Sequence, residues 1–393
     1  MRKTAIIAAA LALTACSVGA PLSLKVVQSE MLRAPEAAYL DGQKGGLKWN
    51  YTTGLELKAM LDVYDAAKQA DESILQYVDD WYDAVIGEDG DIGGKYKISN
   101  FSTDHICPGR TLFRLGELSG KQKYGMAQHR LFAQIKQQPR TSEGNFWHKR
   151  IYPGQVWLDG LYMAQPFYAE YASRYLSDSL QNEVYQDIAK QFTLAYEHCL
   201  DPSTGLLRHA WDFTRGMFWA DPQTGQSAHA WGRALGWYAM ALVDVMEIIS
   251  EGESRDSLAS LLQKVYDVLP RYADPETGLW YQVLDCPGRE GNYLEATCNA
   301  MFVYAWLKGI RLGALDRDGL KDACKTYKNM LRVFVSTDED GVVSLNQCCE
   351  VAGLGGKEMR SGDYDYYIHE RIRANDPKGI GPLIWAALEY EKL

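Results

Sequence analysis

The stretch that decides the fold is residues 145–175, NFWHKRIYPGQVWLDGLYMAQPFYAEYASRY. It begins as a short polar and aromatic loop and continues into a long run in which apolar and aromatic residues recur at helical spacing. One carboxylate, Asp159, lies among the hydrophobic residues at the start of this predicted helix. Burying a charge without a partner is unfavourable, so this acid needs an explanation.

Two explanations of Asp159 follow from its position. The helix dipole stabilises an acid in the first turn of a helix, and Asp159 would then be purely structural. Alternatively, burial raises the pKa of a carboxyl group toward neutrality, as a general acid requires. The rest of the chain favours the second, and we take Asp159 as a candidate catalytic acid.

Short turns recur along the chain and divide it into similar units. Each turn has polar residues or a proline at its start and a glycine suited to positive φ, and a short extended piece follows, which we call a tongue. The glycines of these turns are Gly90, Gly144, Gly205, Gly278 and Gly341.

Helical runs fill the intervals between the turns. They span residues 55–70, 72–86, 108–118, 125–137, 155–175, 182–198, 230–249, 257–272, 294–313, 318–335 and 382–391. Paired helices must bury their apolar faces against neighbouring pairs. We predict an all-α fold, an (α/α)6 barrel with short β-like tongues in the loops, in which the tail helix completes the sixth pair with the first helices. An open solenoid is the alternative, but it needs polar capping repeats that the sequence does not show.

The first residues are typical of an export signal. A basic start and a short apolar segment precede LTAC at residues 13–16, which resembles the lipoprotein processing box, with Cys16 as the lipidated residue. The alternative is a plain signal peptide cleaved near Ala20. We predict a lipoprotein signal over residues 1–16, an N-terminal tether over 17–40 and a single catalytic domain over 41–393. The protein would then lie in the bacterial cell envelope, as a periplasmic or outer-membrane lipoprotein.

Composition narrows the classes of ligand. A net charge of −10 argues against nucleic acid as a partner, whereas 11 Trp and 25 Tyr suit surfaces on which sugars stack. The cysteines are too irregularly spaced for a disulfide framework, and no metal-binding motif occurs. We therefore expect no metal or other cofactor, and membrane contact through the lipid anchor only.

Five further polar or aromatic residues precede or begin predicted helices or lie in the tongues. Asp104 lies just before the helix that Pro108 begins, where capping is the alternative role. His148 and Trp157 flank the tongue of the opening stretch, and His209 lies in the next tongue. Tyr51 precedes the first core helix, where it is equally suited to packing.

Arg233 and Trp237 are four residues apart and share a helix face. An arginine fork matches a carboxylate, and a tryptophan offers a flat apolar face to a sugar ring. A cation–π pair that holds two helices is the structural alternative. Together with the acids and histidines, these residues suit an acidic sugar as ligand.

Four segments resemble glycoside hydrolase family 105, the unsaturated rhamnogalacturonyl hydrolases, which are related to the unsaturated glucuronyl hydrolases of family 88. The segments are WNYTTGLELKAMLDVY (49–64), FWHKRIYPGQVWLDGLYMAQPF (146–167), HAWGRALGWYAMALVDVME (229–247) and YDYYIHERIRANDPKGIGPLIWAALEYE (364–391). The resemblance implies an (α/α)6 barrel and no cofactor.

The resemblance also implies roles for the candidate residues. Asp159 would protonate C4 of a 4,5-unsaturated uronic acid at the non-reducing end of a lyase-generated pectic oligosaccharide, and water would add at C5. Asp104 corresponds to the second acid of the family. The substrate-contacting positions correspond to His209, Arg233, Trp237 and, with them, Tyr51, His148 and Trp157. One departure is Ala234-Leu235, where the family motif has Gly-Asn.

Two other functions fit the same residues. An inverting glycosidase on this barrel would use Asp104 and Asp159 as acid and base on saturated sugars. A sugar-binding lipoprotein without catalysis would also use aromatic tongues and a lipid anchor, although binding alone does not require a protonated carboxyl group.

Overall fold

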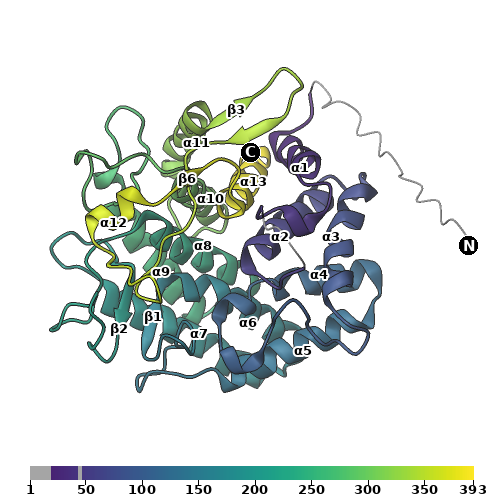
Figure 1. Ribbon diagram of the computed structural model, residues 1–393, viewed down its shortest axis with the longest axis horizontal. Coiled ribbons are helices and arrows are strands. Elements are labelled where there is room, and N and C mark those ends of the chain that lie inside the picture. The colour runs from purple at the N-terminus through teal and green to yellow at the C-terminus, as the bar shows by residue number, and fades with distance from the viewer. Residues whose placement is uncertain (1–18, 43–46) are drawn as a thin grey trace, which may run out of the picture.

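The structure is a computed structural model that describes residues 19–42 and 47–393. Six helices form an inner ring in which each contacts the next, and the last contacts the first. They are α2 (Tyr51–Ala66), α4 (Gly109–Ser119), α6 (Leu158–Tyr175), α8 (Gly232–Ile248), α10 (Ala296–Arg311) and α13 (Pro377–Glu391). This closed ring confirms the predicted (α/α)6 barrel (Figure 1).

Six outer helices each pack on one inner helix. They are α3 (Glu72–Val85), α5 (Gln122–Gln137), α7 (Asp178–Cys199), α9 (Glu253–Val268), α11 (Leu320–Phe334) and α1 (Leu22–Arg33). The predicted helices therefore exist, with ends that differ by a few residues. Helix α1 was not among the predicted helices.

Helix α1 corrects the prediction that residues 17–40 are a tether. It packs on α13, and its Val26 and Val27 are fully buried. Ser23 donates to the Glu391 carboxylate from both its backbone amide and its hydroxyl, at 3.0 and 2.6 Å. The sixth helix pair thus joins the two ends of the described chain, purple beside yellow in Figure 1. Cys16 and the rest of the predicted signal lie outside the described residues.

The tongues form as predicted. The turn glycines have φ between 71° and 122°, and the segments on the two sides of each turn pair as antiparallel bridges or strands. The strands are β1 (Gln155–Trp157), β2 (Ala210–Asp212), β3 (Val335–Thr337), β4 (Val343–Leu345), β5 (Cys348–Cys349) and β6 (Ile372–Arg373), and β1 pairs with β2, β3 with β4 and β5 with β6. A short helix, α12 (Tyr364–His369), lies between β5 and β6 in the chain.

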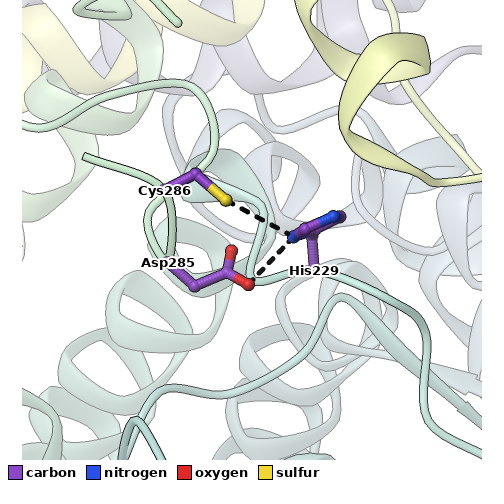
Figure 2. Close-up of side chains that lie close together, drawn as sticks. All are labelled: His229, Asp285 and Cys286. Carbon is purple, nitrogen blue, oxygen red and sulfur yellow. Dashed lines mark hydrogen bonds and ion pairs between the residues drawn. The ribbon is translucent and has the colours of Figure 1, made fainter. Parts of the chain in front are cut away.

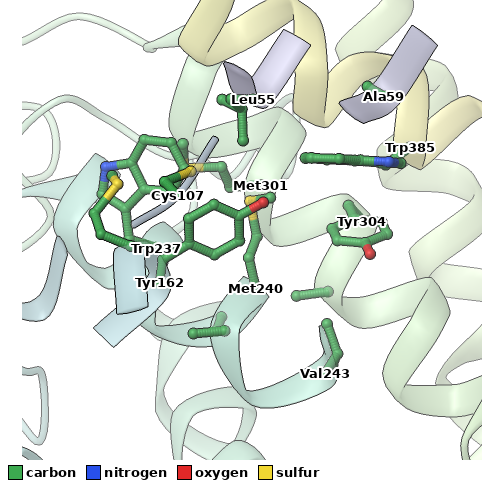
Figure 3. Packing of buried hydrophobic residues seen from close by; sticks show 14 of the residues in the cluster. Leu55, Ala59, Cys107, Tyr162, Trp237, Met240, Val243, Met301, Tyr304 and Trp385 are labelled. Atoms are coloured by element: carbon green, nitrogen blue, oxygen red, sulfur yellow. The ribbon is translucent and has the colours of Figure 1, made fainter. Parts of the chain in front are cut away.

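The core fills the inside of the ring. Side chains from facing inner helices meet there, among them Leu55, Met301 and Trp385 (Figure 3). Charged residues are buried there too: Asp244 of α8 is paired with buried Arg110 at 2.9 Å and buried Lys308 at 2.8 Å. A search of the described helices for a membrane-spanning candidate, by length and apolar character, found none.

Candidate active site

The polar residues gather where the six inner helices begin. At or just before the first turn of these helices lie, in chain order, Tyr51, Asp104, Asp159, Arg233, Glu295 and Asp376. Tyr51 is close enough to Asp104, Arg233 and Asp159 that their charges act on its hydroxyl group. Helix N-termini carry partial positive charge, so their convergence favours an anionic ligand.

The pairing of β1 with β2 brings Asp159 to His209. Trp157 lies opposite Ala210 in this ladder, and the amide of Leu158 donates to the His209 carbonyl at 3.2 Å. Asp159 follows β1 by two residues, and His209 immediately precedes β2. The Asp159 Oδ2 and His209 Nε2 atoms consequently lie 3.3 Å apart, and neither atom has a well-aligned hydrogen bond within the described chain. Both atoms are buried, although the Asp159 side chain as a whole is 15 % exposed.

His148 connects this pair to the second acid. Its Nε2 is 3.7 Å from Asp104 Oδ1, and Lys149 Nζ lies 2.5 Å from Asp104 Oδ2. Its Nδ1 is 3.0 Å from the Thr103 hydroxyl. The charges of both Asp104 and Asp159 act on the His148 ring. The structure therefore places the two candidate acids on either side of His148, in one site.

Aromatic rings form one wall of the site. Trp157 stacks on Tyr152, at 5.1 Å between ring centroids, and on His148, at 4.7 Å, and these two rings stack on each other at 6.4 Å. The His209 ring meets the same tryptophan edge-on at 5.2 Å. This wall holds both histidines in fixed orientations, because each ring is packed against Trp157.

Arg233 and Trp237 have different surroundings. Arg233 donates to the carbonyl of Cys349 and lies over the Trp231 ring at 4.5 Å, but no carboxylate in the described residues is ion-paired with it. Trp237 is 1 % exposed and packs against Tyr162 in the core, as Figure 3 shows. Its expected role as a sugar platform is therefore wrong, because the side chain lies beneath the site.

The electrostatics correct the predicted pKa of Asp159. Burial is the largest single influence and raises the pKa of this carboxyl group, but the interactions with basic neighbours, His209 first, together outweigh burial. His148 and Arg233 add to the lowering, and the pKa lies below its usual value. The apolar neighbours in sequence suggested a raised pKa, whereas the neighbours in space are basic. In the free protein Asp159 is a carboxylate at neutral pH.

The other acid and its histidine are also shifted. Burial raises the pKa of Asp104, yet Lys149 and then His148 outweigh burial and lower it. Burial, followed by the charge of Lys149, lowers the pKa of His148 to about 4. At neutral pH the site thus holds a neutral His148 between two carboxylates.

A cavity opens beside these residues. It has a volume of about 690 Å³, and its lining includes Tyr51, Asp104, Lys149, Glu350 and Arg373. Burial, followed by the charge of Asp104, raises the pKa of Tyr51, so its hydroxyl stays protonated. The cavity gives a ligand access to Asp104 from the solvent.

One group of potential metal ligands lies near the site, formed by His229, Asp285 and Cys286 (Figure 2). His229 Nδ1 is 2.9 Å from Asp285 Oδ2 and 3.8 Å from the Cys286 sulfur. The same Asp285 oxygen is paired with Arg208 at 3.0 Å. A cation would have to compete with this guanidinium group. We therefore assign Asp285 a structural role, in which it holds the segments of Arg208 and His229 together.

Two residues of the site were missed from sequence. Lys149 adjoins His148 in the chain, and an alternating pattern in the tongue was the only available sign of its role. Tyr367 of α12 has its hydroxyl 2.7 Å from His209 Nδ1 although it lies 158 residues away, a contact that no local pattern reveals.

The fold and the site together define a glycoside hydrolase with a helical toroid, and comparisons with known proteins agree. The family model described as Glycosyl Hydrolase Family 88 matches residues 22–393. The chain belongs to this family. It is similar to a solved family 105 glycoside hydrolase of C. acetobutylicum ATCC 824, with 40% identity and a TM-score of 0.89 over 95% of this chain and 100% of that one.

Further relatives support the assignment. Protein Atu3128 of Agrobacterium fabrum is 37% identical over 234 residues, which are 58% of this chain and 97% of that protein. A possible GH105 member from Klebsiella pneumoniae shares the fold, with 22% identity and a TM-score of 0.74 over 100% of this chain and 99% of that one.

Proposed function

We propose that the protein removes a 4,5-unsaturated uronic acid from the non-reducing end of lyase-generated pectic oligosaccharides of the rhamnogalacturonan type. The observation that carries the proposal is the placement of Asp159 with His209 at the converging helix N-termini, near an Arg233 that has no ion-paired carboxylate among the described residues. An acid beside an anion-binding pocket is what this substrate needs, because its own carboxylate adjoins the double bond.

The proposed reaction begins with proton transfer. Asp159 gives its proton to C4, and the positive charge that develops at C5 is stabilised by the ring oxygen. Water then adds at C5, and its proton returns to Asp159, either directly or by way of the neighbouring Asp104. The hemiketal formed in this way opens, and the aglycone leaves. No net proton is consumed, and the acid is regenerated.

The lowered pKa of free Asp159 is compatible with this acid role. A bound uronate places a negative charge close to Asp159, and a like charge raises the pKa of a carboxyl group. Arg233 would hold the uronate and limit the rise. The acid would then take up its proton as substrate binds, which couples protonation to the presence of the correct ligand.

Two variants test this assignment. Asp159→Asn keeps the size of the side chain but cannot transfer a proton, so we expect turnover to vanish while calorimetry still detects binding of an unsaturated disaccharide. Asp104→Asn, measured in the same assays, tests the contribution of the second acid separately from that of Asp159. Turnover of a saturated oligosaccharide by the wild type would favour an inverting glycosidase, and binding without any turnover would favour a sugar-binding protein.

We also propose that the protein is a lipoprotein of the cell envelope, anchored through Cys16. The support is the LTAC box at residues 13–16 after a short apolar segment. Cys16→Ser should release the protein from the membrane fraction and abolish labelling by a radioactive fatty acid. Equal labelling of the variant would overturn the proposal.

A further inference from the structure

Beyond the acids, the structure assigns a role to a tyrosine of α12. We propose that Tyr367 sets the tautomer of His209, so that the ring carries its proton on Nε2 and directs it toward Asp159. Tyr367 is a positioning residue, since it acts on the reacting acid only through the histidine. The consequence for catalysis rests on the proposed function, whereas the tautomer itself does not.

The hydrogen-bonding options of the pair are few. The Tyr367 hydroxyl lies 2.7 Å from His209 Nδ1, and both side chains are fully buried. Within the described chain, neither atom has another hydrogen-bond partner. A tyrosine hydroxyl has one proton to donate, and a buried donor without an acceptor carries the full penalty of lost hydration.

Proton counting then selects one arrangement. If Nδ1 carried the ring proton, it would donate to the tyrosine oxygen, and the tyrosine proton would have no acceptor. Nε2 would at the same time turn a lone pair toward Asp159 Oδ2, 3.3 Å away. A doubly protonated ring leaves the tyrosine proton equally unsatisfied. With Tyr367 as donor to Nδ1, the tyrosine proton has an acceptor, and the Nε2 proton lies beside the Asp159 carboxylate, 3.3 Å away, although not in a well-aligned hydrogen bond.

The tyrosine is held firmly enough for this task. Its ring stacks on Trp231 at 5.9 Å with an angle of 20° between the planes. Its carbonyl accepts from Gln282 at 3.2 Å. Asp363 begins the short helix α12 by accepting from the amide of Tyr366 at 2.8 Å. The hydroxyl is therefore fixed before any ligand binds.

The Nε2–H group has a clear use in the proposed reaction. When Asp159 gives up its proton, a negative charge develops on its carboxylate. A preoriented donor beside this carboxylate stabilises the charge as it forms. The groups that face His209 are the Asp159 carboxylate from α6, the Tyr367 hydroxyl from α12, and the rings of Trp157 and Trp231. No other titratable group of the described chain is in direct contact with the ring.

Nuclear magnetic resonance of protein labelled with ¹⁵N-histidine reads the tautomer directly. The chain has 7 histidines, and His209→Gln identifies the His209 signals by their loss. We expect the wild type at neutral pH to show a neutral ring with its proton on Nε2. A proton on Nδ1, or a doubly protonated ring, would overturn the proposal without any reference to catalysis.

Tyr367→Phe then tests the cause. We expect it to populate the other tautomer and to lower kcat about 10- to 100-fold with a smaller change in KM, as is usual for a partner that orients a functional histidine. Tyr238→Phe is the matched control, because it also removes a buried hydroxyl, one that donates to the Phe192 carbonyl at 3.0 Å. The control should leave the tautomer and kcat unchanged.

The two kinds of failure are distinguishable. If the wild type hydrolyses no unsaturated uronide, the proposed function is wrong, yet the tautomer measurement still stands. If Tyr367→Phe keeps the wild-type tautomer, Tyr367 does not set it, whatever the reaction. If the variant does not fold, the wild-type spectrum still tests the proposal, because a proton on Nδ1 or a doubly protonated ring would overturn it.

Discussion

Asp159 and His209 lie 3.3 Å apart, Oδ2 to Nε2, because two short strands far apart in the sequence pair directly ahead of them. The register that sets Trp157 opposite Ala210 leaves each strand end beside one of the two residues. The acid thus lies at the start of a helix of the barrel, and the histidine lies in a tongue. The proposed chemistry uses both residues, and the strand pairing is what brings them together.

The pH dependence of the reaction should reveal how Asp159 acquires its proton. Its pKa is lowered in the free protein, so at neutral pH few molecules carry the acid form. A bound uronate raises this pKa, and we expect the basic limb of kcat to lie about one pH unit or more above the basic limb of kcat/KM. Parallel pH profiles with an unsaturated disaccharide measure both limbs. Coincident limbs would show that the substrate charge does not act on Asp159.

Arg233 should bind the carboxylate of the substrate. Lysine keeps the charge in Arg233→Lys but loses the fork geometry, so we expect KM to rise about 10-fold or more with a smaller change in kcat. Arg311→Lys is a control, because Arg311 is ion-paired at the surface with Glu247 and Glu389. Steady-state kinetics on both variants provide the comparison. An unchanged KM in Arg233→Lys would remove Arg233 from the binding site.

His148 should make stability depend on pH. Its pKa is about 4 in the folded protein against 6.5 in an unfolded chain, so between these values the unfolded chain binds more protons. Stability due to this residue is therefore complete above pH 6.5 and is lost as the pH falls toward 4, by roughly 3 kcal/mol in total. We expect the unfolding free energy of His148→Gln to change less with pH in this range. Denaturant unfolding of both proteins at several pH values measures the difference, and equal slopes would contradict the assignment.

The buried charges of the ring interior should be stability determinants. Asp244→Ala leaves buried Arg110 without its carboxylate and buried Lys308 with Glu247 alone, which we expect to cost about 3–5 kcal/mol of unfolding free energy. Glu117→Ala breaks half-exposed pairs with Arg114 and Arg174 and should cost less than about 1 kcal/mol. Denaturant titrations of the two variants compare these costs directly. If Asp244→Ala lost as little unfolding free energy as Glu117→Ala, the Asp244 network would not be stabilising.

The periodic parts of the fold were predictable from sequence for a physical reason. Each inner helix buries most of its surface, and each turn needs a glycine at positive φ. Both features therefore produce a pattern in the local sequence. The apolar pattern of helix α1 is weaker, since buried Ser23, Ser29 and Glu30 interrupt its apolar face. Its burial depends on α13, at the other end of the chain.

The sequence indicated several residues of the candidate site, such as Asp104, His148, Asp159 and His209, but not its electrostatics. Asp159 has apolar neighbours in sequence, and these suggested a raised pKa. The opposite shift comes from His209, His148 and Arg233, which only the folded chain brings near. The contact between Tyr367 and His209 likewise arises from tertiary packing. Local sequence identifies which residues carry chemistry, but it does not give the charges around them.

The most direct test follows the ultraviolet absorbance of the conjugated double bond in lyase-generated disaccharides from rhamnogalacturonan, polygalacturonate and glycosaminoglycans. Hydration of the double bond removes this absorbance. We predict that purified wild-type protein abolishes the absorbance of the rhamnogalacturonan disaccharide and that Asp159→Asn does not. Persistent absorbance on all three substrates, with reducing sugar released from a saturated oligosaccharide, would contradict the account.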